Sequence, residues 1–240
     1  MTIPREVHPT MIRSTHTWLL LLLLSVAPGT PGFAEDAPKS ETTEAAYTQA
    51  ITQRADKIVA TLGLTDTNQA TQVRNLIAQQ YRDLGKIHDT RDARINAAKE
   101  TSGADKATLD AAIQTARDEA KTDLDKLHGE FLAKLSASLT PAQVDQVKDG
   151  LTYGVVHGTY NVYLKMYPEL TDAQKQQIMA WLVEAREIAM DQGTANEKHA
   201  VFGKYKGRIN NYLSKAGYDA KKGGENLKKS TQPTTEPQPE

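Results

Sequence analysis

Apolar residues recur every three or four positions along most of the chain, which is the spacing of one face of an α-helix. The two longest stripes lie in residues 66–99 and 105–138, and the short polar segment Thr101-Ser102-Gly103 separates them. Two helices of this length joined by a short turn are expected to form an antiparallel hairpin. Shorter stripes predict further helices, and these lie in the ranges 44–62, 140–150, 151–167, 171–192 and 194–216. The pattern therefore predicts an all-α fold, in which a long antiparallel helical hairpin packs with shorter C-terminal helices in a single domain.

The first 34 residues have the three parts of a secretory signal peptide. Arg13 supplies positive charge, and a ten-residue apolar run extends from Trp18 to Ala27. Gly32 and Ala34 then place small residues at the two positions that signal peptidase inspects. A retained anchor helix is the alternative, but the run is short for a hydrocarbon layer about 30 Å thick. We therefore predict cleavage after Ala34 and export to the periplasm or beyond, without a membrane anchor.

The two ends of the mature chain carry no apolar stripe. Residues 35–43 form a polar leader, and the lysine-, glycine- and proline-rich residues 221–240 are expected to be a disordered tail. This leaves residues 44–220 for the helical domain. Either Met1 or Met11 could begin the signal peptide. The chain has no cysteine, which excludes disulfides, thiolate–metal sites and a lipoprotein anchor.

Overall charge gives no reason to expect nucleic acid or an anionic membrane as a partner. Residues 35–240 contain 27 basic and 29 acidic side chains, a net charge of −2, whereas such partners are bound by strongly basic surfaces. The sequence also has no phosphate-binding loop, no G-x-S-x-G motif and no H-E-x-x-H motif. No two histidines stand at metal-ligand spacing. We therefore predict no catalytic residue, no cofactor and no metal.

A short motif recurs at the predicted helix starts. It reads LTPAQ at 139–143 and LTDAQ at 170–174, with a degenerate copy, LTDTN, at 64–68. The threonine hydroxyl and the glutamine side chain can cap each other's backbone amides, which forms a capping box. Residues 194–197 offer a further box. Capping explains the motif fully, although LTxxQ is also similar to the repeat of certain periplasmic chaperones, which are exported helical proteins built on long hairpins.

The predicted C-terminal helices hold most of the aromatic residues. Nine of the twelve in the mature chain lie between residues 151 and 220. Flat rings with polar tips suit a sugar, because the ring face meets C–H groups and nearby polar groups bind hydroxyls. At helical spacing the same rings could simply fill the core.

The helix predicted at 194–216 has an unusual face. Gly203 and Gly207 stand four residues apart, and each costs about 1 kcal/mol in a helix relative to alanine. Another helix, a ligand or a mobile segment is therefore expected to approach closely. An adjacent polar stripe, with spacings of four, three and four, could bind hydroxyls or carboxylates, or could be a solvated face; its members are Lys204, Arg208, Asn211 and Lys215. The candidate ligand-binding residues are Tyr160, His199, Phe202, Lys204, Tyr205, Arg208 and Asn211.

Four segments of the chain carry a family resemblance. They read RADKIVATLGL at 54–64, RNLIAQQYRDL at 74–84, TPAQVDQVKDGLTYGVV at 140–156 and WLVEAREIAMDQGTANEKHAVFGKYKGRINNYLSKAGYD at 181–219. With these segments the chain resembles a bacterial secreted family named domain of unknown function 3826. The resemblance implies an accessory component of a polysaccharide-degrading system, with a suggested role in sugar binding. It provides no catalytic residue.

Three functional hypotheses follow. The first is an exported, non-catalytic protein that binds oligo- or polysaccharide through the aromatic C-terminal helices. The second is a periplasmic chaperone of the LTxxQ type, which would hold protein clients on a large apolar patch of the hairpin. The third is a polysaccharide hydrolase or lyase, which would require a cleft with two facing carboxylates.

Overall fold

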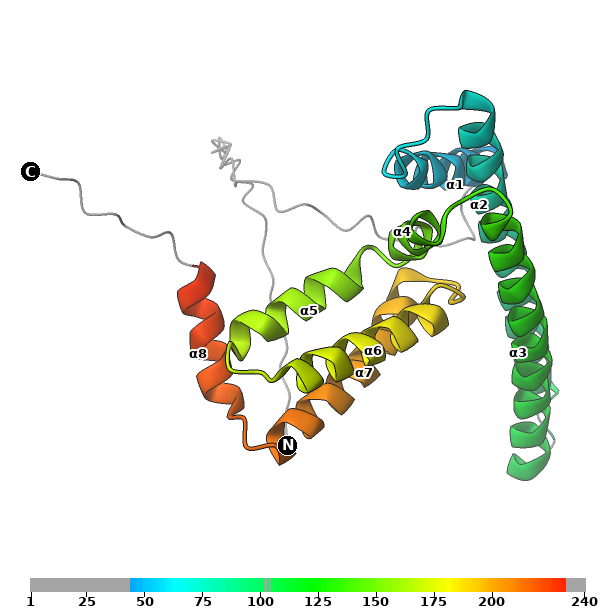
Figure 1. Cartoon of the computed structure of the whole chain (residues 1–240). Helices are drawn as coiled ribbons and strands as arrows, with labels where there is room; N and C mark the ends of the chain where they lie inside the picture. Colours follow the sequence, from blue (N-terminus) through cyan, green and yellow to red (C-terminus); the bar gives the residue numbers. More distant parts are fainter. Residues whose placement is uncertain (1–43, 102, 104, 232–240) are drawn as a thin grey trace, which may run out of the picture. The chain divides into compact units, whose positions relative to one another are not determined.

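The computed structural model describes residues 44–101, 103 and 105–231, and within these ranges the chain forms α-helices and no strands (Figure 1). The helices are α1 (Glu44–Val59), α2 (Thr67–Glu100), α3 (Lys106–Ser136), α4 (Pro141–Leu151), α5 (Val155–Met166), α6 (Asp172–Ala189), α7 (Ala195–Lys215) and α8 (Ala220–Thr231). The predicted all-α fold is therefore confirmed. No helix in these ranges is long and apolar enough to cross a membrane. The expected signal peptide and leader lie outside the described residues.

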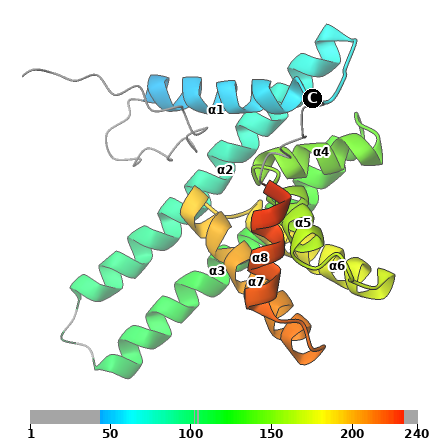
Figure 2. The same cartoon turned by 90° about the vertical axis from the view of Figure 1, so that its left-hand side faces the viewer.

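Helices α2 and α3 form the predicted antiparallel hairpin (Figure 2). The half of the hairpin nearest α1 and α4 is held by a hydrophobic cluster. This cluster includes Ile51 and Ile58 of α1, Val73, Ile77 and Ala78 of α2, Phe131 and Leu135 of α3, and Val144, Val147 and Leu151 of α4. After His88, no residue of α2 is buried. The other half of the hairpin is therefore held by few apolar contacts.

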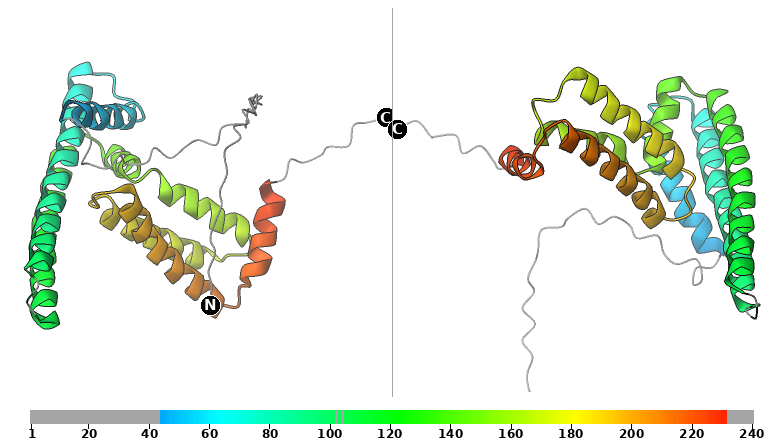
Figure 3. Two further views of the ribbon diagram at one scale, coloured as in Figure 1. Left: turned by 180° about the vertical axis from the view of Figure 1, so that it is seen from behind. Right: turned by 90° about the horizontal axis from the view of Figure 1, so that it is seen from below.

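A second hydrophobic cluster joins the C-terminal helices. Its members include Val156 and Tyr163 of α5, Ile178, Leu182 and Ala185 of α6, and Phe202, Ile209 and Leu213 of α7. Helices α6 and α7 lie side by side (Figure 3). Their apolar residues repeat every three or four positions and point into this cluster, which leaves the polar stripes of both helices facing solvent.

Three of the predicted capping boxes are present. Thr140 with Gln143, Thr171 with Gln174, and Thr194 with Glu197 cap the starts of α4, α6 and α7. The degenerate copy at 64–68 behaves differently, because the carboxylate of Asp66 accepts from the amides of Asn68 and Gln69 at the start of α2. An aspartate at the N-cap can bind two free amides by itself, so a reciprocal glutamine is not required there.

The disordered tail expected from residue 221 is wrong for residues 221–231, which belong to α8. This helix packs on α5. Gly223 is buried against the ring of Tyr167, and Asn226 Nδ2 donates to the carbonyl of Met166 at 3.0 Å. The contact uses a glycine and an amide instead of an apolar stripe, which is why hydrophobic periodicity does not reveal it. The remaining tail residues, 232–240, lie outside the described residues.

Candidate functional site

The solvent-facing sides of α6 and α7 carry a cluster of four interlocked side chains, Trp181 and Glu184 from α6 and Tyr205 and Arg208 from α7, here called the Trp181 surface. The guanidinium carbon of Arg208 lies 4.5 Å from the centre of the Trp181 ring. This geometry is a cation–π contact. The ring of Tyr212 meets Trp181 edge-on, with 5.2 Å between ring centres. The indole is thus fixed by a cation on one side and an aromatic ring on another.

Glu184 of α6 binds both α7 members of the cluster, Tyr205 and Arg208. Tyr205 Oη donates to Glu184 Oε1 at 2.8 Å, and Arg208 Nη1 lies 3.5 Å from Glu184 Oε2. Desolvation raises the pKa of Tyr205, and the hydrogen bond to the Glu184 carboxylate raises it further. The phenol therefore stays protonated and continues to donate. A ligand would meet aromatic groups, a carboxylate and a guanidinium whose positions are set before it arrives.

The structure brings four of the seven predicted ligand-binding residues to this part of α7. Tyr205 and Arg208 belong to the Trp181 surface, and the exposed Lys204 and Asn211 extend its polar stripe by one turn in each direction. Residues 204, 208 and 211 follow the four- and three-residue spacing that places side chains on one helix face. This polar stripe therefore has the arrangement that the sequence predicted.

The other three predicted residues lie elsewhere. Phe202 is only 1% exposed and belongs to the core, so no ligand can reach its ring. Tyr160 is partly buried and packs against the same core. His199 stands nine residues, or two and a half turns, from Arg208, which places it on the opposite side of α7. There it stacks on Tyr153, with 5.8 Å between ring centres.

No other helix of the described residues packs against the two glycines of α7. A Cβ atom added at Gly203 or Gly207 would meet no other atom within 4 Å, and both residues are exposed. The prediction that another helix packs there is therefore wrong. The apolar side of α7 contacts α6 through Phe202, Ile209 and Leu213 instead, and the glycine face is open to solvent.

Two residues of the Trp181 surface were missed by sequence reasoning. Trp181 follows the apolar stripe of α6 and packs in part against the second hydrophobic cluster, and Glu184 resembles an ordinary surface charge. Their separation of three residues places them on the same face of an α-helix. This spacing could have indicated the site from the sequence, because it places an aromatic ring and a carboxylate on one face of the helix.

Residues 48–232 match the family model described as "Protein of unknown function (DUF3826)", which covers α2 to α8 and most of α1. The chain belongs to this family. No curated protein matches the sequence.

In this DUF3826 protein, the other side of α6 carries a cluster of ion pairs around the buried Arg186. The side chain of Arg186 is only 6% exposed, and its Nη1 and Nη2 bind Asp149 Oδ1 at 2.9 Å and Asp145 Oδ1 at 2.7 Å. Glu187 Oε1 lies 3.3 Å from Arg186 Nη2, and Lys148 Nζ donates to Glu187 Oε2 at 2.8 Å. Each of the three carboxylates is thus paired with a cation, so the cluster joins α6 to α4.

Two histidines extend this network to the hairpin of the DUF3826 fold. His88 Nε2 donates to the carbonyl of Asp191 at 2.8 Å, and His128 Nδ1 donates to Asp191 Oδ2 at 2.7 Å. The hydrogen bond with Asp191 raises the pKa of His128 and outweighs burial, which acts in the opposite direction. Despite these histidines and carboxylates, no group of three potential metal ligands occurs within the described ranges.

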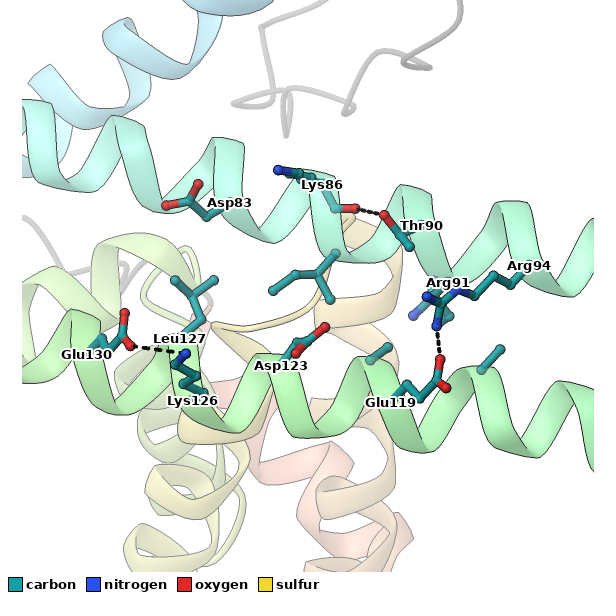
Figure 4. Close-up of a pocket in the computed structure, with 13 residues that line it drawn as sticks. Asp83, Lys86, Thr90, Arg91, Arg94, Glu119, Asp123, Lys126, Leu127 and Glu130 are labelled. Carbon is teal, nitrogen blue, oxygen red and sulfur yellow. Dashed lines mark hydrogen bonds and ion pairs between the residues drawn. The ribbon is translucent and has the colours of Figure 1, made fainter.

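A groove of about 330 Å³ runs between the two hairpin helices (Figure 4). Its rim alternates acidic and basic side chains, including the ion pair of Arg94 with Glu119 and that of Lys126 with Glu130. The large exposed hydrophobic residues in the described part of the chain are Tyr153, Val162 and Ile188, and none lies on the hairpin. The groove therefore does not have the apolar patch expected of a chaperone, and its carboxylates are interleaved with cations.

Proposed function

We propose that this protein is an exported, non-catalytic carbohydrate-binding protein that acts as an accessory component of a polysaccharide-degrading system. The observation that carries the proposal is the Trp181 surface, where aromatic rings, a guanidinium and a carboxylate are fixed beside one another on the solvent-facing side of α6 and α7. The signal-peptide pattern of residues 1–34 is the reason to expect that the protein meets polysaccharide outside the cytoplasm.

The chemistry of this surface suits a sugar. A pyranose ring has apolar C–H patches that pack on aromatic rings, while its hydroxyl groups both donate and accept hydrogen bonds. Glu184 can accept from such hydroxyls, whereas Arg208, Lys204 and the amide of Asn211 can donate to them. The open face at Gly203 and Gly207 leaves room for a chain that extends beyond one sugar unit.

The proposal is tested on a glycan array with residues 35–240 and with two variants. Arg208→Gln removes the guanidinium over Trp181, and Arg94→Gln is a matched control. Both arginines pair with a glutamate, and their side chains are 52% and 55% exposed. We expect the wild type and Arg94→Gln to bind the same glycans, and Arg208→Gln to bind them about tenfold more weakly, as expected for the loss of one charge-assisted contact.

Two results would contradict the proposal. One is that the folded wild-type protein binds no glycan on an array that covers plant, algal and microbial polysaccharides. The other is that Arg208→Gln and Arg94→Gln bind equally well, which would place the sugar away from the Trp181 surface.

A further inference from the structure

Positive charge is concentrated at the C-terminal end of the described chain. Residues 195–231, which form α7, α8 and the turn between them, contain nine basic and three acidic residues, a net charge of +6. Residues 44–194 carry a net charge of −4. The near-neutral total therefore hides two regions of opposite sign, and the basic region includes the helix that supplies Arg208 to the Trp181 surface.

Most of this positive charge is available to a ligand. Seven lysines of α7 and α8 are exposed: Lys204, Lys206, Lys215, Lys221, Lys222, Lys228 and Lys229. None of these seven pairs with a carboxylate of the described residues, whereas three exposed lysines of the hairpin, Lys106, Lys121 and Lys126, do. Unpaired, solvated cations attract an anionic partner without first having to break an internal ion pair.

The cations of α7 follow the same stripe as the proposed sugar site. Lys204, Arg208 and Lys215 are separated by four and seven residues, which places them on one side of the helix. At 1.5 Å per residue they span about 16 Å along its axis. A ligand that lies along this stripe would meet three cations in succession and the aromatic rings of the Trp181 surface between them.

From these observations we infer that the carbohydrate is an acidic polymer, whose sugar units carry carboxylates that bind the cationic stripe of α7 and the lysines of α8. This inference rests on the proposed function. A uronic acid combines the two properties that the surface addresses, since its ring has apolar C–H patches and its carboxylate matches the guanidinium and ammonium groups. A neutral polysaccharide would leave the lysine stripe without a role in binding.

Paired polymers that differ only in charge test the inference. Residues 35–240 are titrated with polygalacturonate and with alginate, and then with each polymer after methyl esterification, which caps the carboxylates and leaves the sugar backbone unchanged. We expect the esters to bind at least about tenfold more weakly. Raising the salt concentration from 50 to 300 mM should weaken binding of the acidic forms by about the same factor, because exposed charges are screened.

Matched lysine variants locate the effect. Lys204→Gln combined with Lys215→Gln is expected to weaken binding of the acidic forms about tenfold. Binding of the esters should weaken less, because the glutamine amide at position 204 can still donate to a sugar hydroxyl. Lys99→Gln combined with Lys134→Gln changes the net charge equally on the hairpin, where both lysines are exposed and lack a partner among the described carboxylates. This control should bind like the wild type.

The possible failures are distinguishable. Equal binding of acidic and esterified polymers, or equal effects of the two lysine pairs, would overturn the inference and leave the proposed function standing. Binding of neutral array glycans without binding of either uronate polymer would have the same meaning. Tight binding of duplex DNA or of phosphatidylserine vesicles, with no glycan bound, would overturn both.

Discussion

Arg186 is the residue whose loss should destabilise the fold most clearly. Its side chain is 6% exposed, and its guanidinium binds Asp145 at 2.7 Å, Asp149 at 2.9 Å and Glu187 at 3.3 Å. Arg186→Met removes the charge but keeps a flexible apolar chain in the same space. The perturbation therefore isolates the ion cluster from the packing of α6 against α4.

The magnitude follows from how deeply each carboxylate is buried. Removing one partner of a fully buried pair typically costs about 3–5 kcal/mol, because the other charge is left without compensation. Here Asp145 is 59% exposed and stays solvated, and Glu187 keeps its bond with Lys148. The substitution affects Asp149 most, because this carboxylate is only 18% exposed and keeps one charged contact, with His157 Nε2 at 3.0 Å. We therefore expect a loss of about 2–3 kcal/mol, below the fully buried case.

Urea unfolding of residues 35–240 measures this difference. Arg94→Met is the control, because Arg94 forms a half-exposed pair with Glu119 and should cost at most about 1 kcal/mol. Asp149→Asn should also cost less in the Arg186→Met background than in the wild type. A free energy of unfolding for Arg186→Met within about 0.5 kcal/mol of the wild type would refute the reasoning, since attraction and desolvation would then cancel.

Further predictions concern two glycines and one histidine. Gly207→Leu should raise the free energy of unfolding by up to about 1 kcal/mol, because leucine favours helix and the face is open. Gly223→Leu should lower the free energy of unfolding by about 1–3 kcal/mol or release α8, since a Cβ alone would stand 2.7 Å from the Tyr167 ring. Urea unfolding measures the stability of both glycine variants, and hydrogen exchange detects the release of α8. If both variants changed the free energy of unfolding in the same direction, the structure would be contradicted. The raised pKa of His128 means that its contribution to stability is complete below about pH 6.5 and is lost as pH rises through the folded pKa. His128→Gln should therefore flatten the stability profile above pH 6.5, as measured by urea unfolding across that pH range.

Helices α1 to α7 could be predicted from the sequence because the pattern that indicates each helix lies within the helix and the residues next to it. The stripes of α2 and α3, the capping boxes at Thr140 and Thr171, and the glycines after α6 and α7 depend on neighbours within a few residues. Helix α8 was not predicted, because the contacts that hold it join Gly223 to Tyr167 and Asn226 to Met166. Such pairings are more than 50 residues apart, and no periodicity encodes them.

The candidate site could be predicted only along α7. The polar stripe of Lys204, Arg208 and Asn211 follows from helical spacing. The partners on α6 do not, because which face of α6 meets α7 depends on how the two helices pack. The role of the two α7 glycines was also misjudged. Sequence gives the helix-propensity penalty of a glycine, but whether a neighbour approaches its face is a property of the packed structure.

The two faces of α6 explain how a surface cluster on this fold can be held rigid. Glu184 and Arg186 are two residues, about 200°, apart on the helix, so one faces solvent while the other faces α4. The ion cluster of Arg186 fixes the rotation of α6 from the inside, and that rotation determines where Trp181 and Glu184 meet Arg208 on the outside. A rotated α6 would separate Glu184 from both Tyr205 and Arg208 together. The buried charges therefore have a positioning role for the proposed sugar site that does not depend on how much net stability they contribute.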